Sequence, residues 1–237
     1  MAAIPIGGDP YDFEYLSCNP PAHRQVRLDA SAVNICYVGT LLPRAGHVVD
    51  VLFRAVARLR ERRPEVLANV RFHFVGTSNQ PDGHRDFAVR DRARAAGIAD
   101  LVIETPQRVS YLEALAILGQ SHGVLLLGSD EPHYTASKIY PAILSGRPLL
   151  GLFHRASSVV PVLQDCGNAL IYDFSGREEL DALDAPVAQG LENLLLHPHI
   201  LPARNIEAFA PYTARQTARR FAELFDDVLR SSPGRRP

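Results

Sequence analysis

Short apolar runs alternate with amphipathic stretches along most of the chain. The apolar runs predict about six strands, at 33–38, 70–75, 101–104, 124–127, 149–153 and 169–172. Between them, apolar positions three or four residues apart predict helices near 48–60, 85–96, 112–118, 138–144 and 159–163. Ser110 and Glu113 have the spacing of a capping box. Strands that are apolar throughout are covered on both faces, so the pattern predicts an α/β protein with one doubly wound, Rossmann-like parallel sheet.

The two ends of the chain depart from this alternation. Residues 1–32 are rich in Pro, Gly and Asp without a clear period, and we expect an irregular lead-in or linker-like segment. The sheet domain is expected over 33–185, with helices of the same domain over 186–230 and a disordered tail over 231–237. The last helix, near 213–229, carries an apolar stripe that should either fold back or mark a docking surface: Phe221, Leu224, Phe225 and Val228.

Composition and charge narrow the classes of function. The 237 residues carry a formal net charge of −1, which gives no general attraction to nucleic acid. The basic stretches 58–63 and 215–220 are expected to be solvated helix faces, with at most weak contact to a membrane surface. The three cysteines lack metal-ligand spacing, and no metal or cofactor is expected. A start without a signal peptide and the absence of a ~20-residue apolar run favour a cytoplasmic protein.

Four polar, Gly/Pro-marked loops follow the predicted strands, at 39–46, 76–82, 105–109 and 129–137. In a parallel sheet of this kind, ligands bind beyond the carboxyl ends of the strands. Ser137 and Lys138 stand where the last of these loops enters a helix, which suits an anion. The alternative is a helix cap followed by a solvated lysine. The arrangement predicts a nucleotide site.

Several segments carry a family resemblance by their order and spacing. Residues 4–13 read IPIGGDPYDF, 37–46 read YVGTLLPRAG, 110–115 read SYLEAL and 137–148 read SKIYPAILSGRP. They resemble the interdomain linker, the first glycine loop, the "PYEEAL" segment and the sugar-nucleotide motif of one family. That family is the retaining, family-4-like group of GT-B glycosyltransferases, and the resemblance is to its carboxyl-terminal, donor-binding domain.

The resemblance implies a site for a nucleotide-diphosphate sugar, linked to UDP or GDP, in polysaccharide or glycoconjugate synthesis of the bacterial type. It places four residues at the diphosphate: Gly39, Thr40, Ser137 and Lys138. It places four others beside the nucleoside: Gly76, Thr77, Arg108 and Val109. His133 and Tyr134, in the loop before Ser137, complete the substrate-binding candidates together with Arg44.

The chain also departs from the family pattern. The family's loop arginine is Thr40 here and its loop lysine is Ala45, although the adjacent Arg44 can supply one lost charge. The paired glutamates of the sugar-nucleotide motif fall on His133 and Pro141. Proline cannot hold ribose hydroxyls, whereas His133 can bond a sugar hydroxyl or a phosphate. The catalytic residues therefore stay open, with Lys138, Arg44 and His133 as candidates.

Length leaves the activity open as well. Enzymes of this family have an amino-terminal acceptor domain of similar size, and this chain begins at the linker, so we expect half of an enzyme and a possible separate acceptor-domain polypeptide. The alternative is a non-catalytic nucleotide-sugar-binding or interaction module. A dinucleotide-dependent enzyme is a weaker hypothesis, because residues 39–44 lack the Gly-x-Gly-x-x-Gly spacing that such an enzyme needs.

Overall fold

The computed structural model describes residues 4–78 and 87–231. One parallel sheet of six strands, in the order β3-β2-β1-β4-β5-β6, forms its centre. The strands are β1 (Val33–Val38), β2 (Val70–Val75), β3 (Val102–Thr105), β4 (Gly123–Leu127), β5 (Leu149–His154) and β6 (Ala169–Phe174). This is the strand order of the doubly wound dinucleotide-binding folds, and it confirms the predicted Rossmann-like sheet.

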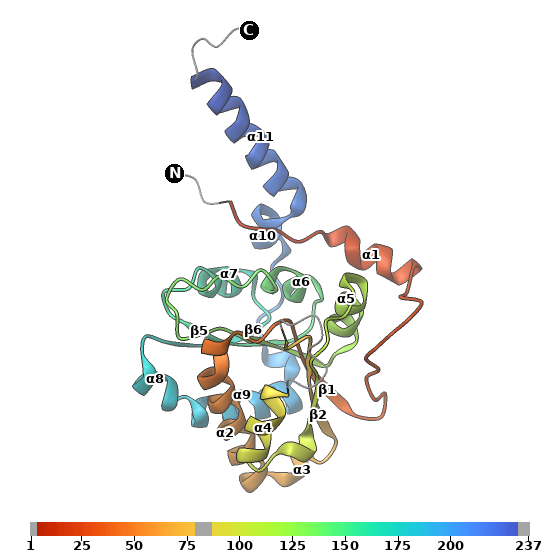
Figure 1. Cartoon of the computed structure of the whole chain (residues 1–237), viewed down its shortest axis with the longest axis vertical. Helices are drawn as coiled ribbons and strands as arrows, with labels where there is room; N and C mark the ends of the chain where they lie inside the picture. The colour runs from red at the N-terminus through yellow and green to blue at the C-terminus, as the bar shows by residue number, and fades with distance from the viewer. Residues whose placement is uncertain (1–3, 79–86, 232–237) are drawn as a thin grey trace.

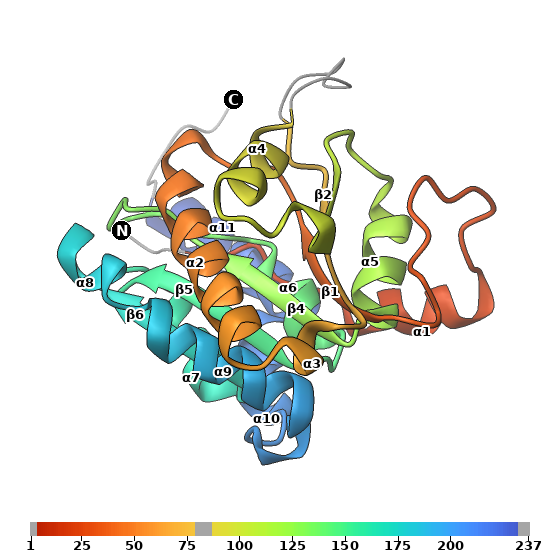
Figure 2. The same ribbon diagram turned by 90° about the horizontal axis from the view of Figure 1, so that it is seen from below.

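Helices cover both faces of the sheet (Figure 1, Figure 2). One layer holds α2 (Gly46–Arg62), α3 (Pro64–Leu67), α4 (Ala88–Ala95), α8 (Arg177–Asp181) and α9 (Asp184–Leu196). The opposite layer holds α5 (Tyr111–Gln120), α6 (Ile139–Leu144) and α7 (Val159–Cys166), with α10 (Ile206–Phe209) beside them. Short 3-10 turns connect these elements: η1 (Pro43–Ala45), η2 (Ala99–Leu101), η3 (Pro198–Ile200) and η4 (Ala210–Tyr212).

Successive side chains of each strand point to opposite faces, so every strand contributes to both helical layers. Under α2 and α9 lies the larger core, in which Phe53 meets Phe74 edge to face with ring centroids 5.5 Å apart. Under α6 and α7 a second core forms around Phe153 and Ile143. Burial on two sides explains why the strands read as continuous apolar runs.

The amino-terminal segment is more ordered than the sequence pattern indicates. Helix α1 (Pro10–Cys18) lies inside the stretch for which we expected irregular structure, and that expectation is wrong there. Asp9 caps the helix by accepting a hydrogen bond from the amide of Tyr11 at 3.0 Å, and Pro10 occupies the first turn. An Asp-Pro pair is a helix-start signal, which the lack of a clear apolar period in the segment obscured.

The segment after α1 is held to the sheet domain by Glu113. Ser110 caps α5 by accepting from the amide of Glu113 at 3.3 Å, as the capping-box spacing predicts. The carboxylate of Glu113 does not complete the box. It accepts instead from the amides of Gln25 and Val26, at 2.5 and 2.9 Å, and its residue is only 2% exposed. One buried carboxylate therefore satisfies two backbone donors of the lead-in.

The last helix, α11 (Ala214–Ser231), stands away from the body of the molecule (Figure 1). Its first turn is joined to the amino-terminal segment, because Gly8 donates to Tyr212 and accepts from Ala214 at 3.0 and 2.9 Å. The apolar stripe does not fold back: its four residues are between 37% and 61% exposed. Within the two described ranges, no helix is both long and apolar enough to cross a membrane. The tail expected to be disordered lies outside the described residues, apart from Ser231.

Candidate functional site

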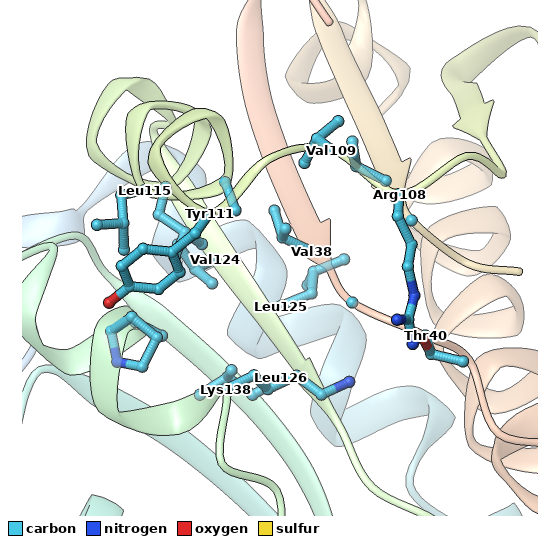
Figure 3. A pocket seen from close by; sticks show the side chains of 17 residues that line it. Val38, Thr40, Arg108, Val109, Tyr111, Leu115, Val124, Leu125, Leu126 and Lys138 are labelled. Carbon is cyan, nitrogen blue, oxygen red and sulfur yellow. Dashed lines mark hydrogen bonds between the residues drawn. The ribbon is translucent and has the colours of Figure 1, made fainter. Parts of the chain in front are cut away.

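A cavity of about 380 Å³ opens where β1 and β4 lie side by side. At this point the strand order reverses, so the connections after the two strands diverge and leave a crevice at their carboxyl ends. The loop after β1, the end of β2, the segment before α5, and helices α5 and α6 form its walls (Figure 3). Most of its lining residues are apolar, among them Val38, Val109, Leu115, Leu118, Leu126 and Ala142.

Lys138 lies at the rim of this cavity. Its ammonium donates to the hydroxyl of Tyr37 and lies 4.1 Å from the centroid of that ring. The Tyr37 hydroxyl in turn donates to the carbonyl of Thr40 at 2.9 Å. The side chain of Lys138 is partly exposed, but its charged end rests on a buried aromatic ring, and this burial lowers the pKa of Lys138 to about 7.

Gly39 allows this approach. Its φ of +139° is rarely adopted by other residues, and a Cβ there would come within 3.4 Å of the Lys138 ammonium. The amide of Gly39 is not available to a ligand, because it donates to Val75 at 2.9 Å and extends the sheet pairing. The amide of Thr40 makes no hydrogen bond with any described residue. Of the amides expected at the diphosphate in this loop, that of Thr40 is therefore the one open to an anion.

Arg108 brings a second cation to the same loop. Its guanidinium lies 3.5 Å from the Thr40 hydroxyl, reaching across from the segment before α5 (Figure 3). Lys138 approaches Gly39 and Thr40 from α6 on the other side. The sequence indicated only a backbone role for Arg108, and no local signal could have placed its side chain, because the contact joins loops 68 residues apart. Two cations thus converge on one end of an otherwise apolar cavity.

Six of the predicted substrate-binding residues line the cavity: Gly39, Thr40, Gly76, Arg108, Val109 and Lys138. Five do not: Arg44, Thr77, His133, Tyr134 and Ser137. Arg44 is engaged elsewhere, since its guanidinium pairs with Asp130 and Glu131 at 2.7 and 3.2 Å. This exposed bridge links the loops after β1 and β4, and it competes with the phosphate contact suggested for Arg44.

The other residues outside the cavity have local roles. The hydroxyl of Thr77 donates to Glu104 at 2.7 Å. The carbonyl of Tyr134 accepts from the hydroxyl of Ser157 at 2.7 Å, which ties the loop to the start of α7. His133 and Ser137 are exposed beside this contact.

Tyr111 is a polar lining residue that the sequence did not single out. It begins α5 and faces the cavity (Figure 3). Its hydroxyl donates to the carboxylate of Asp12 in α1 at 2.5 Å. Burial and the neighbouring carboxylate raise the pKa of Tyr111. Because α1 was not predicted, this partner could not be foreseen.

Comparisons with known proteins bear on the fold. No protein-family profile matches the sequence, and no curated protein is significantly similar to it. Among solved structures, a UDP-forming α,α-trehalose-phosphate synthase from Burkholderia vietnamiensis superposes with a TM-score of 0.70 over 98% of this chain, at 13% identity. Sucrose-phosphate synthase from Thermosynechococcus elongatus gives a TM-score of 0.64 over 97%, at 17% identity. The chain has the fold of a GT-B glycosyltransferase domain.

A further neighbour of this GT-B domain is HepE from Anabaena, solved in complex with UDP and glucose. It has a TM-score of 0.55 and 15% identity over 84% of this chain. The chain spans about half the length of these three structures: 52%, 53% and 49%. At such identities the similarity establishes the architecture and does not transfer residue roles.

Proposed function

We propose that this chain is the donor-binding half of a retaining GT-B glycosyltransferase and holds a UDP- or GDP-linked sugar. The observation that carries this proposal is the division of the cavity at the switch point. Lys138 and Arg108 meet at Gly39 and Thr40 at one end, while valine and leucine side chains line the rest. A diphosphate fits the cationic end, and an aromatic base fits the apolar walls.

The same cations suit the chemistry of glycosyl transfer. Breaking the bond between sugar and diphosphate leaves negative charge on the departing phosphate oxygens. An ammonium and a guanidinium fixed beside them stabilise that charge more in the transition state than in the bound donor. The diphosphate also favours the charged form of Lys138, because an anion raises the pKa of a neighbouring amine. Lys138 is therefore our leading candidate for a catalytic residue, ahead of Arg44 and His133.

The acceptor and the remaining catalytic groups are assigned to another polypeptide or segment. The chain spans about half of its structural neighbours, and the exposed stripe of α11 is an apolar face that such a partner can cover.

A second candidate is a nucleotide-sugar-binding module without catalytic activity. It is favoured by the Arg44 bridge to Asp130 and Glu131, which occupies a cation otherwise available to phosphate, and by the apolar Pro141 in the cavity wall. Both candidates require the nucleotide to bind. They differ in whether addition of the acceptor half produces turnover of the donor.

Titration calorimetry with UDP and GDP tests the shared step. We expect saturable binding of at least one nucleotide and a loss of about tenfold or more in affinity for Lys138→Ala, because a charge-assisted contact to phosphate is removed. Arg215→Ala, on exposed α11, is the matched control and should leave affinity unchanged. If neither UDP nor GDP binds saturably, both candidates are ruled out.

A further inference from the structure

The polar side chains of the cavity are unevenly placed. Of the 17 described residues that line it, four have polar side chains: Thr40, Arg108, Lys138 and Tyr111. The first three gather around the loop after β1. Among the described lining residues away from that loop, Tyr111 is therefore the one with a polar side chain.

Helix α6 changes character within one turn. Lys138 stands at its start, and Pro141 and Ala142 follow three and four positions later, on the same side of the helix. At 1.5 Å per residue, they lie about 5 Å further along the helix than the base of the lysine. The cavity wall thus passes from a cation to a pyrrolidine ring and a methyl group over the length of one sugar ring.

The covalent structure of a nucleotide decides what faces this wall. The pentose is joined to the diphosphate through its 5′-carbon, so it is the next group along the ligand. The donor sugar is joined to the other side of the diphosphate. With the diphosphate at Lys138, Thr40 and Arg108 and the base in the apolar part of the cavity, we place the pentose beside Pro141 and Ala142. The base then reaches the valines and leucines beyond them.

Among the residues that the structure describes, this wall offers little to sugar hydroxyls. Pro141 has no N–H, and its carbonyl accepts from Ser145 at 2.9 Å. The amide of Ala142 donates to the backbone carbonyl of Lys138 at 3.3 Å. The Tyr111 hydroxyl gives its single proton to Asp12 and keeps only acceptor capacity. One acceptor suits one hydroxyl, whereas the neighbouring 2′- and 3′-hydroxyls of ribose need partners for two.

From this count we infer that the cavity selects a 2′-deoxyribonucleoside diphosphate, and hence a donor sugar carried on a deoxynucleotide. The inference rests on the proposed function, since it specifies the nucleotide of that same cavity. Its physical basis is that a hydroxyl buried without a hydrogen-bond partner weakens binding, whereas the hydrogen of a 2′-deoxy sugar suits an apolar wall.

Calorimetry of the whole chain with UDP and with 2′-deoxyuridine diphosphate measures the effect of the 2′-hydroxyl alone, because the two nucleotides differ only in that group. We expect the deoxynucleotide to bind about fivefold tighter or more. Equal or tighter binding of UDP overturns the inference but leaves the nucleotide site itself intact. The same comparison between GDP and 2′-deoxyguanosine diphosphate covers the other base, and if none of the four nucleotides binds, the proposed function fails together with the inference.

Two substitutions of Pro141 test whether the preference for the deoxynucleotide comes from the wall formed by Pro141 and Ala142. Pro141→Glu supplies a carboxylate that can accept from both ribose hydroxyls, so the ratio of the two affinities should reverse toward UDP. Pro141→Ala adds no polar group, and it should keep the preference for the deoxynucleotide. The new carboxylate also repels the phosphates, but it repels those of both nucleotides equally, so this effect cancels in the ratio of the two affinities. A deoxynucleotide preference that survives Pro141→Glu overturns the assignment.

Discussion

At the scale of single residues, Lys138 shows how one side chain acquires a titration near neutral pH. Its ammonium lies on the buried ring of Tyr37, where contact with water is reduced and the charged form is disfavoured. The nearest oxygen is a hydroxyl already donating to Thr40, so no carboxylate offsets that cost at this contact. A bound phosphate would provide the missing negative partner, so we predict that donor binding is coupled to proton uptake.

The coupling predicts the pH dependence of donor binding. In the free protein the pKa of Lys138 is about 7, and the bound diphosphate raises it. Affinity for UDP-glucose should therefore be full below pH 7 and fall as pH rises above it, by at most about tenfold per unit. Calorimetry in buffers of different ionisation enthalpy measures the proton uptake directly. Lys138→Arg keeps its charge and should bind with a flat profile between pH 7 and 9; a flat profile in the unmodified chain would contradict the coupling.

At the scale of elements, α5 organises the side of the sheet on which the cavity opens. It contributes Leu115 and Leu118 to the cavity wall and Tyr111 to the mouth. Through Glu113 it also fixes the segment between α1 and β1, whose backbone would otherwise have one buried and one partly buried amide without an acceptor. The lead-in is thus held by a polar contact to a helix, in addition to the packing of α1.

Removal of the Glu113 carboxylate should destabilise the whole domain. Glu113→Ala leaves the amides of Gln25 and Val26 without their acceptor, and we expect a loss of about 2–4 kcal/mol in the free energy of unfolding. Urea denaturation measures it. Glu61→Ala, on the exposed side of α2, is the control and should change stability by less than about 0.5 kcal/mol. An equally small effect at both positions would show that the lead-in is held by other contacts.

At the scale of the whole molecule, the sheet domain and α11 differ in how they are stabilised. The domain has two helical layers and two large cores, whereas α11 extends from it with its apolar stripe uncovered (Figure 1). A helix of this kind receives little support from tertiary packing. Its apolar face is available for association and contributes little to the folding of the domain.

Substitutions on this stripe should affect association more than stability. We expect Phe221→Ser with Phe225→Ser to change the free energy of unfolding by less than about 1 kcal/mol, because both side chains are exposed and the helix propensities are similar. Phe209→Ala, at a buried phenylalanine of α10, should cost about 3–5 kcal/mol. Sedimentation velocity should show less self-association, or less binding of an acceptor half, in the double variant. A large loss of stability there would mean that α11 packs on the domain in solution.

The sequence was most informative where the physical signal is local. The strands β1 and β2 have the predicted bounds, because burial on both faces produces an unbroken apolar run. The helix α1 was missed because its signal is a cap and a proline, without an apolar face, and its own residues are not buried. The predicted Ser110 cap formed, since it depends on residues three apart, whereas the distant partners of Glu113 could not be read from that spacing.

The sequence by itself therefore determined the sheet, its layers and the loops that gather at its carboxyl edge, because hydrophobic periodicity encodes which side of each element is buried. Only the tertiary structure decided which of those loop residues share a cavity. It brought Lys138 onto Tyr37 and Arg108 toward Thr40, and it directed Arg44 to Asp130 instead. Each of these contacts joins residues more than 60 positions apart, and their meeting depends on how the loops cross, which no local pattern specifies.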